Sequence, residues 1–530
     1  MKKHIYISAL LLFTSILPAC TDLDVAVESE LTPANFPSTQ DQFIAATGPL
    51  YSQFSSAYAI NYWRLQELST DAAIIPARAG NWDDGGQYRF LHKHTWNVDH
   101  PTVRAIWEWG FGGINTANRV LQILEGAAPG TSRTESVAQV RTMRALFYYF
   151  MMDNFGNVPI IKTFGNTELP ATAPRAEVFT FIQTELNEAL PDLSDATGAL
   201  TYGRPNKFLA LALLTKMYLN AEYYIGKPMY TEAVAMADDI LSANKFTLTP
   251  DYYSMFAPDN GPSVQETIFA AVYDANLIKG NQFTRFAMHY ALQQKYQIPF
   301  TPSSSLMTLP KFYNKFNLSG DIRNDQWLVG KQYYADGSPV IINTTNVGLN
   351  KDYNGPDPTA KVAWQLEIFP NLILENEASM DIGNDILSQA YGVRSIKYAP
   401  DPNASTDRYQ NNDMPVFRLS DVLLMKAEAI LRGATATTVG GELQTPLVLV
   451  NKIRDRVNAP QITNIDLAGL LEERARELAW EGWRRNDLIR FGQFEQPWGF
   501  KTDSDPNKRI YPIPATERSL NPNLTQNPGY

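Results

Sequence analysis

The chain has almost no cysteine and a shortage of positive charge, and each shortage excludes a class of protein. Cys20 is the only cysteine in 530 residues, so the sequence offers neither a disulfide framework nor a thiolate metal site. Acidic residues outnumber basic ones, 55 to 45, which gives a net charge of −10. An acidic chain without a basic cluster is a poor candidate for binding nucleic acid or anionic lipid head groups.

The sequence also lacks the common catalytic motifs. It contains no GxSxG, no HExxH, no phosphate-binding GxxxxGK[ST] loop and no GxGxxG after a predicted strand. The carboxylate pairs Asp83/Asp84 and Glu375/Glu377 do not identify a glycosidase, because sequence spacing does not give the separation of the two groups. His92 and His94 have no further ligands at a metal-binding spacing. We therefore expect no catalysis, no cofactor and no metal ion, although calcium at residues 83–86 stays open despite the missing EF-hand pattern.

The first twenty residues indicate where the protein acts. Lys2 and Lys3 precede an apolar run over residues 5–17, and Leu-Pro-Ala-Cys at 17–20 is typical of a bacterial lipoprotein cleavage site. A membrane span takes about 20 apolar residues, so this run is too short to be one. We expect residues 1–19 to be a signal peptide, Cys20 to carry acyl chains, and residues 20–37 to be a polar tether. No later apolar run is long enough to cross a membrane, so lipid is the only attachment expected.

Helical periodicity governs most of the remaining chain. A capping-box pattern at Ser38 and Asp41 predicts a first helix, and apolar spacing predicts further helices over 103–124, 137–151, 178–190, 208–221, 230–241, 418–432, 447–457 and 467–483. Within the last of these, Glu472/Arg476 and Glu481/Arg485 are spaced as exposed i,i+4 pairs. The pattern predicts a mainly α fold built of helical hairpins; a scaffold of tetratricopeptide-like helical hairpins is implied only by the family resemblance described below. The proline- and asparagine-rich tail, 511–530, is expected to pack across the helices.

The periodicity fails between residues 252 and 412. Gly, Pro, Asn, Asp and Ser dominate there, and the strand candidates, 266–272 and 340–343, are few and short. An irregular insert of this length is unusual unless it is functional. We divide the mature chain into a helical region, 38–251, and a second region, 252–530, that contains this insert, and we expect the two to form one compact unit.

Five segments carry a resemblance to a known family. They are Arg144–Ile161 (RALFYYFMMDNFGNVPII), Arg418–Gly433 (RLSDVLLMKAEAILRG), Val450–Pro460 (VNKIRDRVNAP), Glu473–Gly492 (ERARELAWEGWRRNDLIRFG) and Tyr511–Tyr530 (YPIPATERSLNPNLTQNPGY). In this order, behind a lipoprotein cleavage site, the chain resembles the SusD/RagB nutrient-binding lipoproteins of Bacteroidetes-type bacteria along nearly its whole mature length. The signature residues Trp480, Trp483, Arg484, Arg485 and Asp487 fit an ion-pair cluster that supports the core better than they fit a binding site.

The resemblance implies an outer-membrane protein, facing the medium, that binds oligosaccharides or polysaccharide. It further implies a partner, a SusC-like TonB-dependent transporter, to which the glycan is delivered. A peptide-binding member of the same family and a lipid-anchored glycan hydrolase are the alternatives, and a helical scaffold for other proteins is a third.

Sugar sites combine an aromatic ring against the sugar face with polar groups at its rim. Two segments have this composition. The first is a loop with Arg78, Asn81, Trp82 and Asp83, where a tryptophan among glycines and aspartates does not fit a periodic core. An anchor for the loop is the alternative role of Trp82. The second is the insert, whose aromatic candidates include Tyr296, Trp327, Tyr334 and Trp364. Burial under the insert is the alternative for each of these four.

Overall fold

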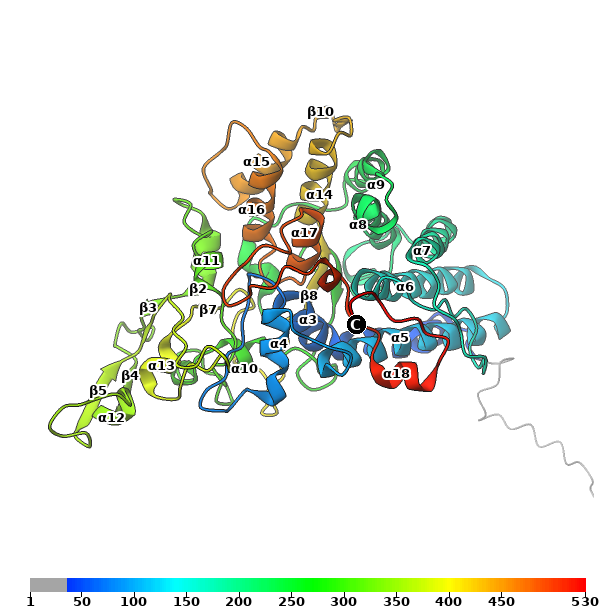
Figure 1. The fold of residues 1–530 in the computed structure, drawn as a ribbon. Coiled ribbons are helices and arrows are strands. Elements are labelled where there is room, and N and C mark those ends of the chain that lie inside the picture. Colours follow the sequence, from blue (N-terminus) through cyan, green and yellow to red (C-terminus); the bar gives the residue numbers. More distant parts are fainter. Residues whose placement is uncertain (1–35) are drawn as a thin grey trace, which may run out of the picture.

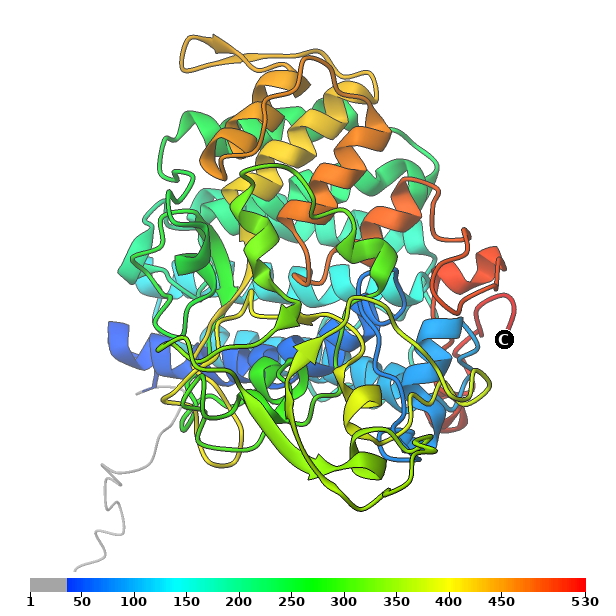
Figure 2. The same cartoon turned by 90° about the vertical axis from the view of Figure 1, so that its left-hand side faces the viewer.

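The computed structural model describes residues 36–530. The predictions for the signal peptide, for Cys20 and for most of the tether concern residues outside this range. Helices fill one side of the molecule, and the insert with its short strands projects on the other, at the lower left of Figure 1. Seen from that side in Figure 2, the insert lies in front of the helical layers.

The first helix begins at a capping box one residue beyond the predicted one. Thr39 accepts the backbone N–H of Gln42, and the Gln42 side chain accepts the backbone N–H of Thr39. These bonds satisfy N–H groups that a helix start leaves without partners. Helix α2, Gln40–Ala57, continues through a π-helical turn, Tyr58–Tyr62, into α3, Trp63–Glu67.

The helical scaffold is a series in which each helix packs on the next. Its members are α5 (Pro101–Gly126), α6 (Thr131–Phe155), α7 (Arg175–Ala189), α8 (Lys207–Ile225) and α9 (Tyr230–Ser242), and α9 packs on α14 (Leu419–Leu431). Gly110 and Gly113 allow α5 and α6 to approach closely, because a Cβ at either position would collide with Met151 or Phe147. The predicted helices of this region are therefore confirmed, whereas their tetratricopeptide-like character stays a prediction.

The C-terminal helices differ from the prediction at one point. Helices α14 and α15 (Pro446–Arg456) form as expected, but the predicted helix 467–483 ends early. Helix α16 spans Leu467–Glu477 and α17 spans Arg484–Arg490, with Trp480 and Gly482 at positive φ between them. Glu481 is buried in this turn and pairs with Lys397 and Arg418, so the exposed pair with Arg485 predicted from spacing is wrong. Glu472 likewise pairs with Lys315, and Arg476 with Glu473.

The remaining elements are short. Between residues 36 and 530 the strands form five antiparallel pairs: β1 (Thr267–Ala271) with β8 (Met414–Arg418), β2 (Trp327–Leu328) with β7 (Arg394–Ser395), β3 (Gly330–Lys331) with β6 (Glu367–Ile368), β4 (Ile341–Thr345) with β5 (Lys361–Gln365), and β9 (Thr438–Val439) with β10 (Glu442–Leu443). The short helices are α4 (Gln87–Lys93), α10 (Phe283–Ala287), α11 (Pro310–Tyr313), α12 (Asn346–Leu349), α13 (Ile386–Ala390) and α18 (Ala515–Leu520). Both predicted strands are present, as β1 and β4.

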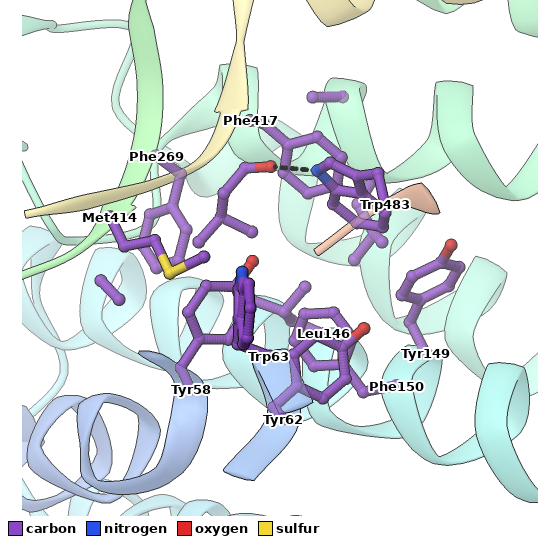
Figure 3. Close-up of a cluster of buried hydrophobic side chains, with 14 of the residues drawn as sticks. Tyr58, Tyr62, Trp63, Leu146, Tyr149, Phe150, Phe269, Met414, Phe417 and Trp483 are labelled. Carbon is purple, nitrogen blue, oxygen red and sulfur yellow. Dashed lines mark hydrogen bonds between the residues drawn. The ribbon is translucent and has the colours of Figure 1, made fainter. Parts of the chain in front are cut away.

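One large core joins both halves of the chain. Figure 3 shows Tyr58 and Trp63 from the first helices beside Phe150 of α6, Phe269 of β1 and Phe417 of β8. Trp483 closes the cluster, and its indole N–H donates to the carbonyl of Val416 over 3.1 Å. The C-terminal tail crosses this body as predicted: Tyr511 donates its backbone N–H to Asn154, and the Asn527 side chain donates to Phe155.

Candidate functional site

The first candidate segment is a short loop, residues 78–86, which we call the Trp82 loop. Arg78 and Asn81 exchange backbone hydrogen bonds of 2.8 and 2.9 Å, which close the loop on itself. The carboxylate of Asp381 accepts the backbone N–H groups of Ala79 and Gly80 at 2.8 and 3.0 Å. Trp82 itself has a φ of +64°, a conformation that tryptophan rarely adopts. The loop is thus fixed to the insert at residue 381 and presents Trp82 from a turn.

Arg78 ties the base of the loop to the protein interior, so its side chain is not available to a ligand. Its side chain is buried, and its guanidinium donates to the carbonyls of Ser303 and Ser304. Burial lowers its pKa to about 9. The sequence could not distinguish this role from ligand contact, because both need a long cationic side chain at a loop base. Arg78 therefore leaves the set of surface candidates.

The other three candidates of the loop lie at or near the surface. Trp82 is half-buried and meets Phe286 of α10 edge to face, with ring centres 5.7 Å apart, and Tyr88 of α4 at 6.5 Å. Asn81 is exposed. Asp83 forms an ion pair of 2.7 Å with Arg89. Because Trp82 is only half-buried, part of its ring stays open to solvent, as a stacking residue requires.

The insert carries a hydrophobic cluster of its own, which we call the insert cluster. Its buried members come from several segments between residues 288 and 404 and include Met288, Phe300, Val340, Ile342 and Leu366. Tyr296, Tyr334 and Trp364 pack on its outer side and are half-buried. Burial raises the pKa of Tyr296 to about 12, and the Tyr334 hydroxyl donates to Gln294 over 3.3 Å. Three of the predicted insert aromatics are therefore brought together around one small core.

Trp327 lies elsewhere. Its side chain is 5% exposed and meets Phe316 and Trp480 edge to face, with ring centres 5.1 and 5.6 Å apart. A ligand in solution cannot reach this ring, so the structure places Trp327 in the main core. Its polar neighbour Arg323 is not a ligand-binding group either, because it is fully buried in an ion-pair network.

A single segment, residues 283–305, connects the two groups of aromatics. At its start Phe286 contacts Trp82. Further on, Met288, Leu292 and Phe300 enter the insert cluster, and Ser304 accepts the backbone N–H of Tyr290 while its own carbonyl accepts from Arg78. The Trp82 loop and the insert aromatics are thus attached to one continuous stretch of chain.

Sequence reasoning missed several residues around Trp82. Phe286 and Tyr88 hold its ring, and Arg64 of α3 lies over both, with its guanidinium carbon 4.5 and 5.3 Å from their ring centres. Arg285 lies over Phe286 at 4.8 Å. The local pattern gave no signal for this grouping, because the residues come from three elements that are remote in sequence.

The two histidines are structural, as expected. His92 is buried and accepts the backbone N–H of Phe500 at 3.1 Å, and His94 contacts the carbonyl of Ser69 at 3.0 Å. Burial lowers the pKa of His92 to about 3, so its ring is neutral at physiological pH. Within residues 36–530, no three His, Cys, Asp or Glu side chains gather as a metal site would require, and no helix there is long and apolar enough for a membrane span.

The signature cluster near the C-terminus is confirmed as structural. Trp480 and Trp483 are buried. Arg484 binds both carboxylate oxygens of Asp71 at 2.7 Å, and Asp487 pairs with Arg474 and Arg490 at 2.8 and 2.6 Å. Burial alone would raise the pKa of Asp487, but the two arginines outweigh it and hold this pKa well below its usual range. Arg484 and Asp487 are met by opposite charges, whereas Arg485 is buried, donates to the carbonyls of Lys508 and Arg509 and lies over the ring of Tyr511. The cluster therefore braces the core and is closed to a ligand in solution.

Comparison with known proteins identifies the family. The model of the SusD family matches residues 245–530, and a second model, described as starch-binding associating with outer membrane, matches residues 23–219. The chain belongs to the SusD family.

Individual relatives agree with this assignment. The chain is 26% identical over 511 residues to the starch-binding protein SusD of Bacteroides thetaiotaomicron, a match that covers 88% of this chain and 84% of the relative. Over 474 residues it is 23% identical to SusD-like protein P25 of Formosa agariphila, covering 81% and 79% of the two chains.

Solved structures share the fold. A SusD superfamily protein of Parabacteroides distasonis superposes with a TM-score of 0.71 at 21% identity, covering 93% of this chain and all of the other. The surface glycan-binding protein A of Bacteroides thetaiotaomicron, solved with laminarihexaose, gives a TM-score of 0.69 at 18% identity, covering 92% and 100%. The mainly α fold with short strands is thus the SusD fold.

Proposed function

We propose that this protein is a non-enzymatic, lipid-anchored glycan-binding protein of the outer-membrane surface. Its relatives include a starch-binding protein and a laminarin-binding SusD-like protein, and the lipoprotein cleavage site at Cys20 supplies the anchor. We further propose that the captured oligosaccharide passes to a SusC-like TonB-dependent transporter. Membership of the SusD family supports this step.

The observation that carries the proposal is the setting of Trp82. Its half-buried ring meets Phe286 edge to face and is presented by a loop whose first residues are fastened to Ser303 and Asp381. The insert aromatics Tyr296, Tyr334 and Trp364 are the second part of the proposed surface, together with the rim groups of Asn81 and Asp83. A sugar face would stack on Trp82 while its hydroxyl groups bond to the polar rim. Since the rings are already packed in place, little side-chain freedom would be lost on binding.

Binding to a panel of neutral and acidic oligosaccharides and of peptide mixtures tests the proposal. We expect glycans to bind, Trp82→Ala to weaken the best of them at least tenfold, and no sugar to be released from polysaccharide. The matched control is Phe164→Ala, which removes an aromatic ring that is 38% exposed in the loop after α6, and it should bind as the wild type does. Binding of peptides alone, or unchanged glycan affinity in Trp82→Ala, would contradict the proposal.

A further inference from the structure

Beside Trp82 the structure gathers positive charge in a chain that is acidic overall. The guanidinium carbons of Arg64 and Arg285 lie 4.5 and 4.8 Å from the centre of the same ring, Phe286. Two like charges on one ring repel each other, so this arrangement lowers stability unless something compensates. Burial lowers the pKa of Arg285, and the positive charges of Arg408 and Arg64 lower it further. We call these three residues the arginine cluster.

No carboxylate neutralises the cluster at close range. Within the part of the chain that the structure describes, none of the three arginines takes part in an ion pair, and the nearby loops' Asp83 and Asp407 pair instead with Arg89 and Lys279. The Nε of Arg285 is buried without any hydrogen-bond partner. Asp84 is the nearby acidic group: its negative charge opposes the burial that lowers the pKa of Arg64, and it adds to the burial that raises the pKa of Tyr88.

The arginines are held in place by the fold. Arg285 is on α10, and its Nη1 donates to the Gln282 side chain at 3.0 Å. Gln410 links the loop of Arg408 to α10, since its side chain accepts the backbone N–H of Thr284 at 2.6 Å. Arg408 is exposed, whereas Arg64 and Arg285 are half-buried. The cluster therefore reaches from solvent down to the ring that supports Trp82.

The recess beside Arg64 is too small and too apolar to hold an anion, so an anion would meet the cluster at the surface. A recess of about 10 Å³ lies between Arg64, Phe286 and the side chains of Ile60, Trp63, Ile75 and Phe283. That volume is close to what one water molecule needs, so a sugar ring would lie across the mouth of the recess and not inside it. Guanidinium groups bind carboxylate and sulfate through paired N–H donors.

We propose that the arginine cluster binds an acidic group, a carboxylate or a sulfate, on a glycan whose neighbouring sugar faces contact Trp82. The inference rests on the glycan-binding function proposed above and assigns its substrate class. An acidic protein repels polyanions as a whole, so a preference for acidic glycans must come from a local site of this kind. Carboxylate and sulfate share the required chemistry, and the experiment distinguishes them.

Affinity electrophoresis in native gels tests the inference with matched polysaccharides. Pectate and fully methyl-esterified pectin differ in carboxylate charge, and dextran sulfate and dextran differ in sulfate charge. We expect the wild type to be retarded by at least one acidic polymer more strongly than by its neutral counterpart. The double variant Arg285→Gln/Arg408→Gln should lose at least fivefold in affinity for that acidic polymer, with little change for the neutral one.

The control removes the same charge elsewhere. Arg119→Gln/Lys227→Gln changes two exposed cations on α5 and in the turn between α8 and α9, and its retardation should match that of the wild type. Equal retardation by acidic and neutral polymers, or an equal loss in both double variants, would overturn the inference while the proposed glycan binding stands. If no glycan of any charge is bound, both proposals fail together.

Discussion

Two regions of this protein in which arginines lie near aromatic rings differ in how their positive charge is neutralised. In the interior, Arg323 contacts Asp321 and Glu473 at 2.7 Å and Glu477 at 3.0 Å, and Arg418 contacts Glu266, Glu477 and Glu481 at 2.6 to 2.9 Å. We call this network the charged core. Beside Trp82, Arg64, Arg285 and Arg408 lack such partners.

The difference teaches how to separate structural from functional arginines. A buried charge is tolerated when paired and hydrogen-bonded, and it is costly otherwise. The charged core meets this condition: burial alone would raise the pKa of Glu477, but Arg456, Arg418 and Arg323 hold it well below its usual range. The arginine cluster does not meet it, which is why we assign it to an external anion.

Replacing one arginine by glutamine in each region should give the largest difference in the free energy of unfolding. Arg323→Gln leaves three buried carboxylates with less compensation, and we expect it to lower the free energy of unfolding by about 3–5 kcal/mol. Arg285→Gln removes a repelled charge, and we expect a change within about 0.5 kcal/mol. Denaturant unfolding at pH 7 measures both. Equal losses in the two variants would remove the distinction between the regions.

Glu67 differs from the carboxylates of the charged core, because it is buried and forms no ion pair with any described residue. Its Oε1 accepts the backbone N–H of Gly482 at 2.8 Å, and its Oε2 has no partner among the described residues. Burial raises its pKa to about 8. The folded protein therefore holds this proton more tightly than the unfolded chain, so the stability it contributes is full below pH 4.5 and is lost as the pH rises to about 8.

Glu67→Gln should remove this pH dependence. Between pH 5 and pH 8 the wild type should lose about 1.4 kcal/mol per pH unit relative to the variant. Unfolding free energies at intervals of one pH unit provide the test, with the exposed Glu232→Gln as control. Parallel profiles for the wild type and Glu67→Gln would show that Glu67 is ionised in the fold.

A more local effect concerns how the Trp82 loop is held. Asp381→Ala removes the acceptor for the N–H groups of Ala79, Gly80 and Gly383, and we expect a loss of about 1 kcal/mol with faster amide exchange in residues 79–83. Asp336→Ala is the control, because that carboxylate bonds only to Ser338, two residues away. Unchanged exchange in Asp381→Ala would indicate that Arg78 alone fixes the loop.

Sequence periodicity predicted most of the scaffold because an amphipathic helix is specified by local spacing. The helices from Pro101 to Ser242, the short strands β1 and β4 and the crossing tail all agree with it. It failed at residues 478–483, where the burial of Glu481 against Lys397 and Arg418 ends the helix. Spacing within one segment carries no information about partners that are some 60 to 80 residues away.

The candidate site, too, could be predicted from the sequence only in part. A tryptophan among glycines and aspartates indicated a presenting turn, and Trp82 is half-open on such a turn. Composition could not separate Trp327 from Trp364, because burial depends on which segments fold over a ring. The five signature segments and their order determined the family from the sequence alone. Only the tertiary structure decided which arginines are neutralised, since Arg64, Arg285 and Arg408 come together from three distant segments and form no ion pair within residues 36–530.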